Sequence, residues 1–166
     1  MAARGVGVGE IGVVTDASAE LVIYGLGSCV GVAVLDPEAG VGGLLHALLP
    51  DASFDPGRAD AEPAVFVDTG IDALLEAVVR AGAEAQRLRV VAAGGARTPG
   101  FAHFEVGQRN VAALRTSLAG RDLGLEASDL GGAGARTMRV NVGGGTVTVL
   151  RGGDARLLLG SPGRTP

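Results

Sequence analysis

The chain has 166 residues, which is enough for one compact domain with its own core and too few for two. Apolar residues make up 47% of the chain and charged residues 19%, which excludes a disordered protein and predicts a globular one. The net charge is −4, there is no lysine, and the arginines are scattered among acids, so we expect no nucleic-acid partner.

The single cysteine and the two histidines limit the chemistry that the chain can carry. One cysteine excludes an intramolecular disulfide and a cysteine-cluster metal site, and two distant histidines make a poor metal site. We therefore expect no metal. The first ten residues lack a basic region followed by an apolar stretch, and no apolar run is long enough to span a membrane. A lone thiol is typical of a reducing compartment, so we expect a cytoplasmic protein without membrane insertion.

Strands joined by tight turns are predicted for the first third of the chain. Apolar residues alternate with glycine or polar residues, which predicts strands over residues 5–14, 21–24, 30–35 and 41–49. The segment Asp36-Pro37-Glu38-Ala39-Gly40 has the composition of a hairpin loop, because proline sets φ and glycine allows a positive φ. Residues 52–62 are polar and interrupted by Pro56 and Gly57, so a loop is predicted there.

The rest of the chain combines two helices with further strands. Helical spacing of apolar residues predicts helices over residues 68–81 and 108–118. Five more strands are predicted over residues 88–93, 124–129, 137–142, 146–151 and 156–159, with a hairpin turn at Gly143-Gly144-Gly145. Two helices are too few to cross over a fully parallel sheet. We expect a single α+β (mixed α/β) domain over residues 1–166, with a core from about residue 7 to 159 and a frayed tail. Its β-sheet layers should be largely antiparallel, with the two main helices packed outside.

The stretch Gly25-Leu26-Gly27-Ser28-Cys29-Val30-Gly31 surrounds the only cysteine. A lone cysteine is most often a small buried hydrophobic residue. Here, however, the glycines allow a sharp bend and a close approach to a substrate. The backbone N–H groups of Gly27, Ser28 and Cys29 could converge on a developing oxyanion. Cys29 is therefore a candidate nucleophile, and Ser28 is a candidate orienting group or oxyanion contact.

A hairpin centred near Glu38 would bring His46 back to the cysteine. In that register His46 lies opposite Gly31, and Cys29 shares a face with Gly31 because it lies two residues away. The side chains of Cys29 and His46 would then be diagonal neighbours, with Cα atoms about 7–8 Å apart. The missing side chain at Gly31 would leave room for a substrate group. A slip of one residue would move His46 to the other face.

A cysteine–histidine pair suits nucleophilic attack on an amide. The histidine takes the thiol proton, the thiolate attacks the carbonyl carbon, and the histidine then protonates the leaving amine. An activated thiol of this kind should alkylate well below the ordinary thiol pKa of about 8.5. A dinucleotide-binding reading of Gly25 and Gly27 fails, because the third glycine is misplaced and a strand follows instead of a helix.

Two further groups of residues have open interpretations. His103 lies between Phe101 and Phe104, in a surface loop or in an exposed aromatic patch for a protein partner. Asp129, Arg136 and Arg109 can form ion pairs, which usually have a solvated or structural role.

The residues around the thiol match a known family. Gly25-Leu26-Gly27-Ser28-Cys29 is followed seventeen residues later by His46 and then by Leu48-Leu49-Pro50-Asp51. This run resembles the CheD family, the chemoreceptor glutamine deamidases of bacterial chemotaxis. The resemblance covers about residues 7–159, because further family segments follow in order: Gly94-Gly95-Ala96, Val106-Gly107-Gln108-Arg109-Asn110, Asp129-Leu130-Gly131-Gly132 and Arg136.

The resemblance implies a fold and a catalytic logic similar to those of a class of bacterial toxin deamidases. It implies that selected glutamines of methyl-accepting chemoreceptors become glutamates through a cysteine thioester, with release of ammonia and without a cofactor. Cys29 matches the family's nucleophile and His46 its general base and acid. We expect the glycines near them to contact the substrate, namely Gly27, Gly31, Gly94 and Gly95. A CheC-type phosphatase is implied as a second partner.

One position departs from the family. Its third catalytic residue is a threonine six residues before the cysteine, and that position here is Ile23. The orientation of His46 would then pass to the hydroxyl of Tyr24 or Ser28, or to a backbone carbonyl. Without such a group the activity would be weak or lost. A CheD-like binding module that regulates a phosphatase or a receptor without turnover is therefore the alternative to a deamidase. A small-molecule amidase ranks last.

Overall fold

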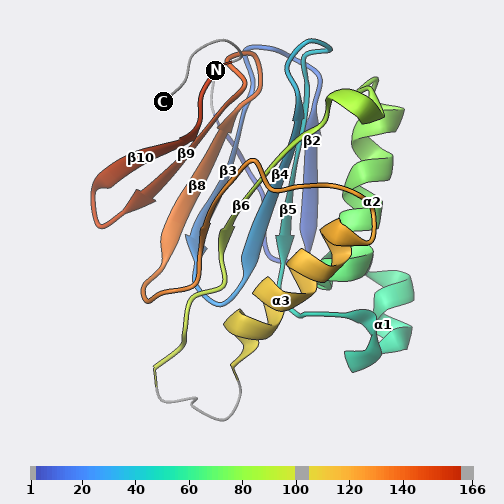
Figure 1. Ribbon diagram of the computed structural model, residues 1–166, viewed down its shortest axis with the longest axis vertical. Coiled ribbons are helices and arrows are strands. Elements are labelled where there is room, and N and C mark those ends of the chain that lie inside the picture. Colours follow the sequence, from blue (N-terminus) through green and yellow to red (C-terminus); the bar gives the residue numbers. More distant parts are fainter. Residues whose placement is uncertain (1–2, 100–104, 162–166) are drawn as a thin grey trace.

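Two five-stranded sheets pack face to face in the computed structural model, which describes residues 3–99 and 105–161 (Figure 1). Sheet A has the order β1-β3-β8-β9-β10 and consists of Arg4–Gly5, Glu20–Leu26, Arg136–Asn141, Thr146–Arg151 and Asp154–Leu159. Sheet B has the order β2-β5-β4-β6-β7 and consists of Glu10–Val14, Val41–Ala47, Val30–Asp36, Arg89–Gly94 and Ala127–Leu130. Among these strand pairs only β1–β3 and β6–β7 are parallel. The prediction of an α+β fold with largely antiparallel layers is confirmed.

Two long helices cover the outer face of sheet B (Figure 1). Helix α2 (Val67–Arg80) and helix α3 (Val106–Ala119) occupy the regions where helices were predicted. Shorter helical segments are α1 (Pro56–Ala61) and the 3₁₀ turns Ala52–Phe54, Pro63–Val65 and Ala85–Arg87. Within the described ranges, no helix combines the length and apolar character needed to cross a bilayer.

Two sequence predictions about the elements were wrong. Residues 5–14 form two strands in different sheets, because Gly9, with φ of +73°, and its neighbours turn the chain between β1 and β2. Residues 52–62 contain helix α1 instead of a continuous loop. Pro56 lies in its first turn, where a missing N–H costs nothing, and the Asp55 carboxylate accepts the Arg58 amide at 3.0 Å.

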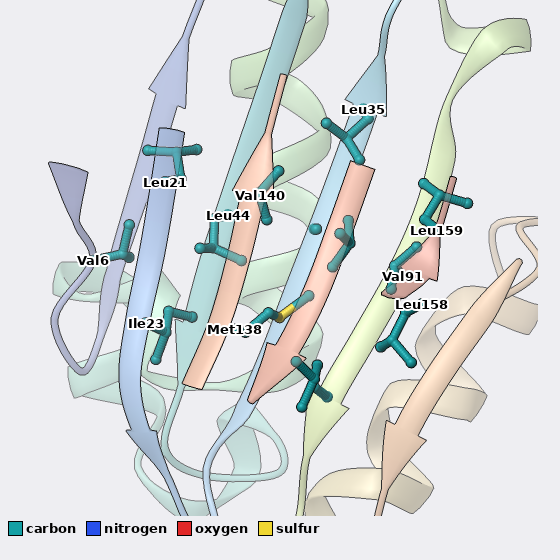
Figure 2. Packing of buried hydrophobic residues seen from close by; sticks show 14 of the residues in the cluster. Val6, Leu21, Ile23, Leu35, Leu44, Val91, Met138, Val140, Leu158 and Leu159 are labelled. Atoms are coloured by element: carbon teal, nitrogen blue, oxygen red, sulfur yellow. The ribbon is translucent and has the colours of Figure 1, made fainter. Parts of the chain in front are cut away.

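The two hydrophobic layers show which way each residue of strand β4 points. One layer fills the space between the sheets and includes Ile23, Leu44, Met138 and Val140 (Figure 2). The other lies between sheet B and the helices and includes Leu45, Ile71 and Leu74. On β4, residues Ala33 and Leu35 face sheet A, whereas Val30, Val32 and Val34 face the helices. The strand is buried on both faces, which explains its continuous apolar sequence.

Candidate active site

The β4–β5 hairpin has the predicted register. Gly31 pairs with His46, and Asp36 pairs with Val41 next to the turn. Gly40 closes the turn with φ of +69°, and its amide donates to the Pro37 carbonyl at 3.3 Å. Because residues of odd number on β4 face sheet A, the paired positions Gly31 and His46 face it too.

Cys29 lies just before β4, in the bend of residues 27–29, and its side chain packs against the core between the sheets. The half-buried thiol is therefore on the same face of sheet B as His46. Beside the bend, a Cβ atom added to Gly27 would meet no heavy atom within 4 Å. The bend thus leaves open space next to the cysteine, as expected if Gly27 contacts the substrate.

Gly94 and Gly95, which were expected to contact the substrate, lie in the segment that holds the cysteine bend through backbone hydrogen bonds. The Gly95 amide donates to the Cys29 carbonyl at 2.9 Å, and the Ala96 amide donates to the Gly27 carbonyl at the same distance. Gly94 has φ of +108°, and a Cβ there would lie 2.2 Å from the Cys29 carbonyl oxygen. Their lack of side chains serves this close backbone packing, and the expected contact with a substrate stays a prediction.

Gly31 does not leave room for a substrate group. A Cβ atom at Gly31 would lie 3.0 Å from Leu26 Cδ1, 3.0 Å from Met138 Sδ and 3.1 Å from Ile23 Cδ1. These side chains come from sheet A and fill the space opposite β4, as facing sheets do when their side chains interdigitate. The room expected beside Gly31 is therefore filled, because this glycine allows the close packing of the two sheets, and a substrate contact at Gly31 stays a prediction.

His46 is oriented by a backbone carbonyl. Its side chain is buried, with 4% of the residue exposed, and Nδ1 lies 3.2 Å from the carbonyl oxygen of Val6. A carbonyl oxygen can only accept a hydrogen bond, so Nδ1 carries the proton and Nε2 keeps the lone pair of a base. This carbonyl is one of the groups expected to replace the family threonine.

The residue at the threonine position cannot orient His46, and its neighbour points elsewhere. Ile23 is completely buried between the sheets. Tyr24 is 62% exposed, and its ring lies 5.8 Å below the guanidinium of Arg139 on the outer face of sheet A. Adjacent residues of a strand point to opposite faces, which excludes the Tyr24 hydroxyl as the orienting group.

Burial favours the neutral forms of both candidate catalytic groups. Burial raises the pKa of the Cys29 thiol, and a backbone hydrogen bond offsets this only in part. Burial also lowers the pKa of His46, although the hydrogen bond to Val6 and the charge of Glu10 act in the opposite direction. The resting pair is therefore a thiol and a neutral imidazole. Fast alkylation of the thiol below its ordinary pKa stays a prediction, and these shifts act against it.

Asn110 connects the chain before Cys29 with the chain after His46. It was not proposed as a site residue from the sequence. It lies on α3 and is fully buried, and its Nδ2 donates to the Ser28 carbonyl at 2.9 Å and to the Leu48 carbonyl at 3.1 Å. One side chain thus ties the residue before Cys29 to the chain just after β5. The signal in the sequence is a polar residue four positions before Leu114, on the apolar face of its helix.

A buried ion pair supports the loop beside the site. Arg136 Nη1 lies 2.7 Å from a carboxylate oxygen of Asp129, which also pairs with Arg151. Arg136 also donates to the Gly131 carbonyl at 2.5 Å, and the Gly131 amide donates to the Gly94 carbonyl at 2.9 Å. The predicted pairing of Asp129 with Arg136 is confirmed, and it is buried.

The sequence analysis also named Arg109 and His103. Arg109 lies on α3 and borders a groove whose lining includes Asp51 and Asp68. The interpretation of His103 and its aromatic neighbours falls outside the described residues.

Comparisons of the sequence with family models and with curated proteins all point to the same family. The family model "CheD chemotactic sensory transduction" matches residues 48–151. A probable chemoreceptor glutamine deamidase CheD of Symbiobacterium thermophilum is 43% identical over 148 residues, which cover 87% of this chain and 89% of the relative. Proteins of the same name are 41% identical in Solibacter usitatus, with 85% and 84% covered, and 38% identical in Thermococcus kodakarensis, with 81% and 84% covered.

The first of these relatives also covers the β4–β5 hairpin, which precedes the segment matched by the family model. A match to 87% of the 166 residues leaves about 22 residues outside the alignment, so an alignment to the first of these relatives must include Cys29 and His46. The segment order, the cysteine–histidine hairpin and these identities over most of the chain agree. The chain belongs to the CheD family.

Proposed function

We propose that this protein is a cysteine-dependent deamidase that converts glutamine side chains of chemoreceptors to glutamate. The names of the relatives support the reaction and the substrate. The observation that carries the proposal is the position of His46: it faces the same side of sheet B as Cys29, and its Nδ1 hydrogen bond leaves Nε2 as the base. A single domain over the whole chain would carry this activity.

The reaction would proceed in two halves. His46 Nε2 takes the proton from Cys29 Sγ while the sulfur attacks the carboxamide carbon of the glutamine. In this proposal the backbone N–H groups of Gly27, Ser28 and Cys29 stabilise the oxyanion. The imidazolium then protonates the departing nitrogen, ammonia leaves, and a thioester remains. A water molecule gives a proton to His46 and attacks the thioester, which releases glutamate and returns the proton to the sulfur.

The neutral resting state suits this sequence of steps. Since burial disfavours both the thiolate and the imidazolium, the proton moves when the substrate carbonyl is present to receive the negative charge. The reducing cytoplasm is the proposed location, because the nucleophile must remain a free thiol. A CheC-type phosphatase is the proposed second partner, and the family resemblance supports it.

Ammonia release from a chemoreceptor fragment tests the proposal. The wild type is expected to release ammonia and to shift the fragment mass by one amide-to-acid change for each modified glutamine. The Cys29→Ala variant should do neither while remaining folded. A fragment with glutamate already at the modified positions is the substrate control. If the folded wild type releases no ammonia from a matched receptor, the proposed deamidase activity is wrong.

Ile23→Thr tests whether the missing threonine limits turnover, which is the basis of the alternative, a binding module without turnover. Because Val6 already accepts from Nδ1, restoring a hydroxyl with Ile23→Thr is expected to leave turnover unchanged. The variant should lose about 1–3 kcal/mol of unfolding free energy, since a hydroxyl replaces an apolar group in a fully buried position. Urea denaturation and ammonia release measure the two effects. A large gain in turnover would show that the wild type lacks an effective orienting group.

A further inference from the structure

The turn between β1 and β2 contacts His46 through several bonds. Glu10 on β2 is the residue paired with His46 on β5. The Gly9 amide donates to the His46 carbonyl at 2.8 Å, and the Val6 carbonyl lies 3.2 Å from Nδ1. Both the backbone and the ring of His46 are therefore held by residues 6–10.

The Glu10 side chain closes this turn. Its Oε2 accepts the Gly7 amide at 2.8 Å, and the Glu10 amide donates to the Gly7 carbonyl at 3.1 Å. Gly7 directly follows Val6, so the carboxylate fixes the peptide that presents the Val6 carbonyl to the imidazole. Paired residues of neighbouring strands point to the same face, which places the Glu10 side chain beside His46.

The other neighbours of His46 provide no competing charge. Gly31 on β4 has no side chain, and Ile23 and Met138 of sheet A, which pack over it, are apolar. Cys29 is the titratable group before β4 on the same face, and burial keeps its thiol neutral. Among the charged groups of the described chain, Glu10 is the one whose charge acts on the imidazole, and it raises the pKa of His46.

We propose that Glu10 is a positioning residue for the deamidation: its carboxylate holds the Gly7 amide so that the Val6 carbonyl orients His46, and its charge stabilises the imidazolium that forms during attack. This inference rests on the proposed function and deepens it. It assigns two separable contributions to one side chain, a hydrogen bond and a negative charge, and each can be removed without the other.

Glu10→Gln removes the charge and keeps an oxygen that can accept the Gly7 amide. With less stabilisation of the imidazolium, the pKa of His46 should fall, and the acidic limb of the kcat/KM profile should move to lower pH. Turnover at neutral pH should drop about two- to fivefold, because the base becomes weaker. Glu10→Ala also removes the hydrogen bond to Gly7, and turnover should drop about tenfold or more.

Two measurements on the full chain test the proposal. Proton NMR titration of the imidazole gives the pKa of His46 without any substrate, and the His46→Asn variant identifies its signal. Ammonia release across pH gives the activity profile. Glu38→Gln is the matched control, since Glu38 lies in the turn at the opposite end of the hairpin and its side chain is exposed. It should change neither the pKa of His46 nor the profile.

The outcomes separate this inference from the proposed function. A lower pKa of His46 and a shifted acidic limb in Glu10→Gln, with a larger loss of turnover in Glu10→Ala, support the inference. An unchanged pKa and an unchanged profile in a folded Glu10→Gln protein overturn it. If the wild type releases no ammonia but Glu10→Gln still lowers the pKa of His46, the placement of Glu10 is supported and the proposed deamidase activity fails.

Discussion

Replacing His46 by asparagine is expected to lower turnover by about 10²–10⁴-fold, the usual contribution of a general base. The Asn side chain can place Nδ2 where Nδ1 of the histidine lies, so the hydrogen bond to the Val6 carbonyl is preserved. What disappears is Nε2, the group that takes the thiol proton. Because burial raises the pKa of the Cys29 thiol, little thiolate forms at neutral pH without that base.

The design separates the loss of the base from a loss of structure. His46→Asn should keep a thermal unfolding transition close to that of the wild type, whereas His46→Ala also loses the Val6 contact and leaves a cavity in a buried site. Ammonia release from the receptor fragment is the activity measurement. If His46→Asn retains more than about a tenth of wild-type turnover, His46 is not the general base.

Replacing Asp129 by asparagine is expected to lower the free energy of unfolding by about 3–5 kcal/mol, because it leaves the buried Arg136 guanidinium without its charged partner. The shape of the side chain and its carbonyl acceptor are kept, so the change removes mainly the charge. Urea denaturation of the wild type and the variant at neutral pH measures the effect. Glu126→Gln, which breaks an exposed pair with Arg89, is the control and should cost less than about 1 kcal/mol.

The difference in unfolding free energy between the wild type and Asp129→Asn depends on pH, because the Asp129 carboxylate titrates. Burial alone would raise the pKa of Asp129, but the Arg151 hydrogen bond and the charges of Arg136, Arg151 and Arg156 outweigh burial and lower it. A lowered pKa in the folded state stabilises the fold above the ordinary aspartate pKa, and this stabilisation is lost as the pH falls through the folded pKa. The difference between wild type and Asp129→Asn should therefore be full at neutral pH and shrink in acid. A difference that grows in acid would contradict the pairing.

The β4–β5 hairpin was predictable because a local signal determines it. The loop from Asp36 to Gly40 sets the turn, and a hairpin centred on that loop places His46 opposite Gly31. The two long helices were predictable for a similar reason, since their apolar spacing lies within one element.

The features that were missed depend on contacts between distant parts of the chain. The space beside Gly31 is filled from β3 and β8, and nothing near Gly31 in the sequence shows that these strands lie opposite it. A backbone carbonyl was among the groups expected to orient His46, but every residue has one, so nothing in the side chains identified Val6 as the acceptor. The break between β1 and β2 was missed because valine and isoleucine alternate with glycine on both sides of the turn.

The contact between Val6 and His46 crosses from one sheet to the other. Cys29 and His46 are synthesised early, within one hairpin of sheet B. Val6 follows β1, which pairs with β3 in sheet A, and that sheet is complete only when the C-terminal strands β8, β9 and β10 have joined it. The Val6 carbonyl reaches Nδ1 only where the two sheets pack together, so the hairpin by itself does not hold the imidazole in place. The orientation of His46 is thus a property of the packed two-sheet domain and is expected to be lost when the two sheets separate.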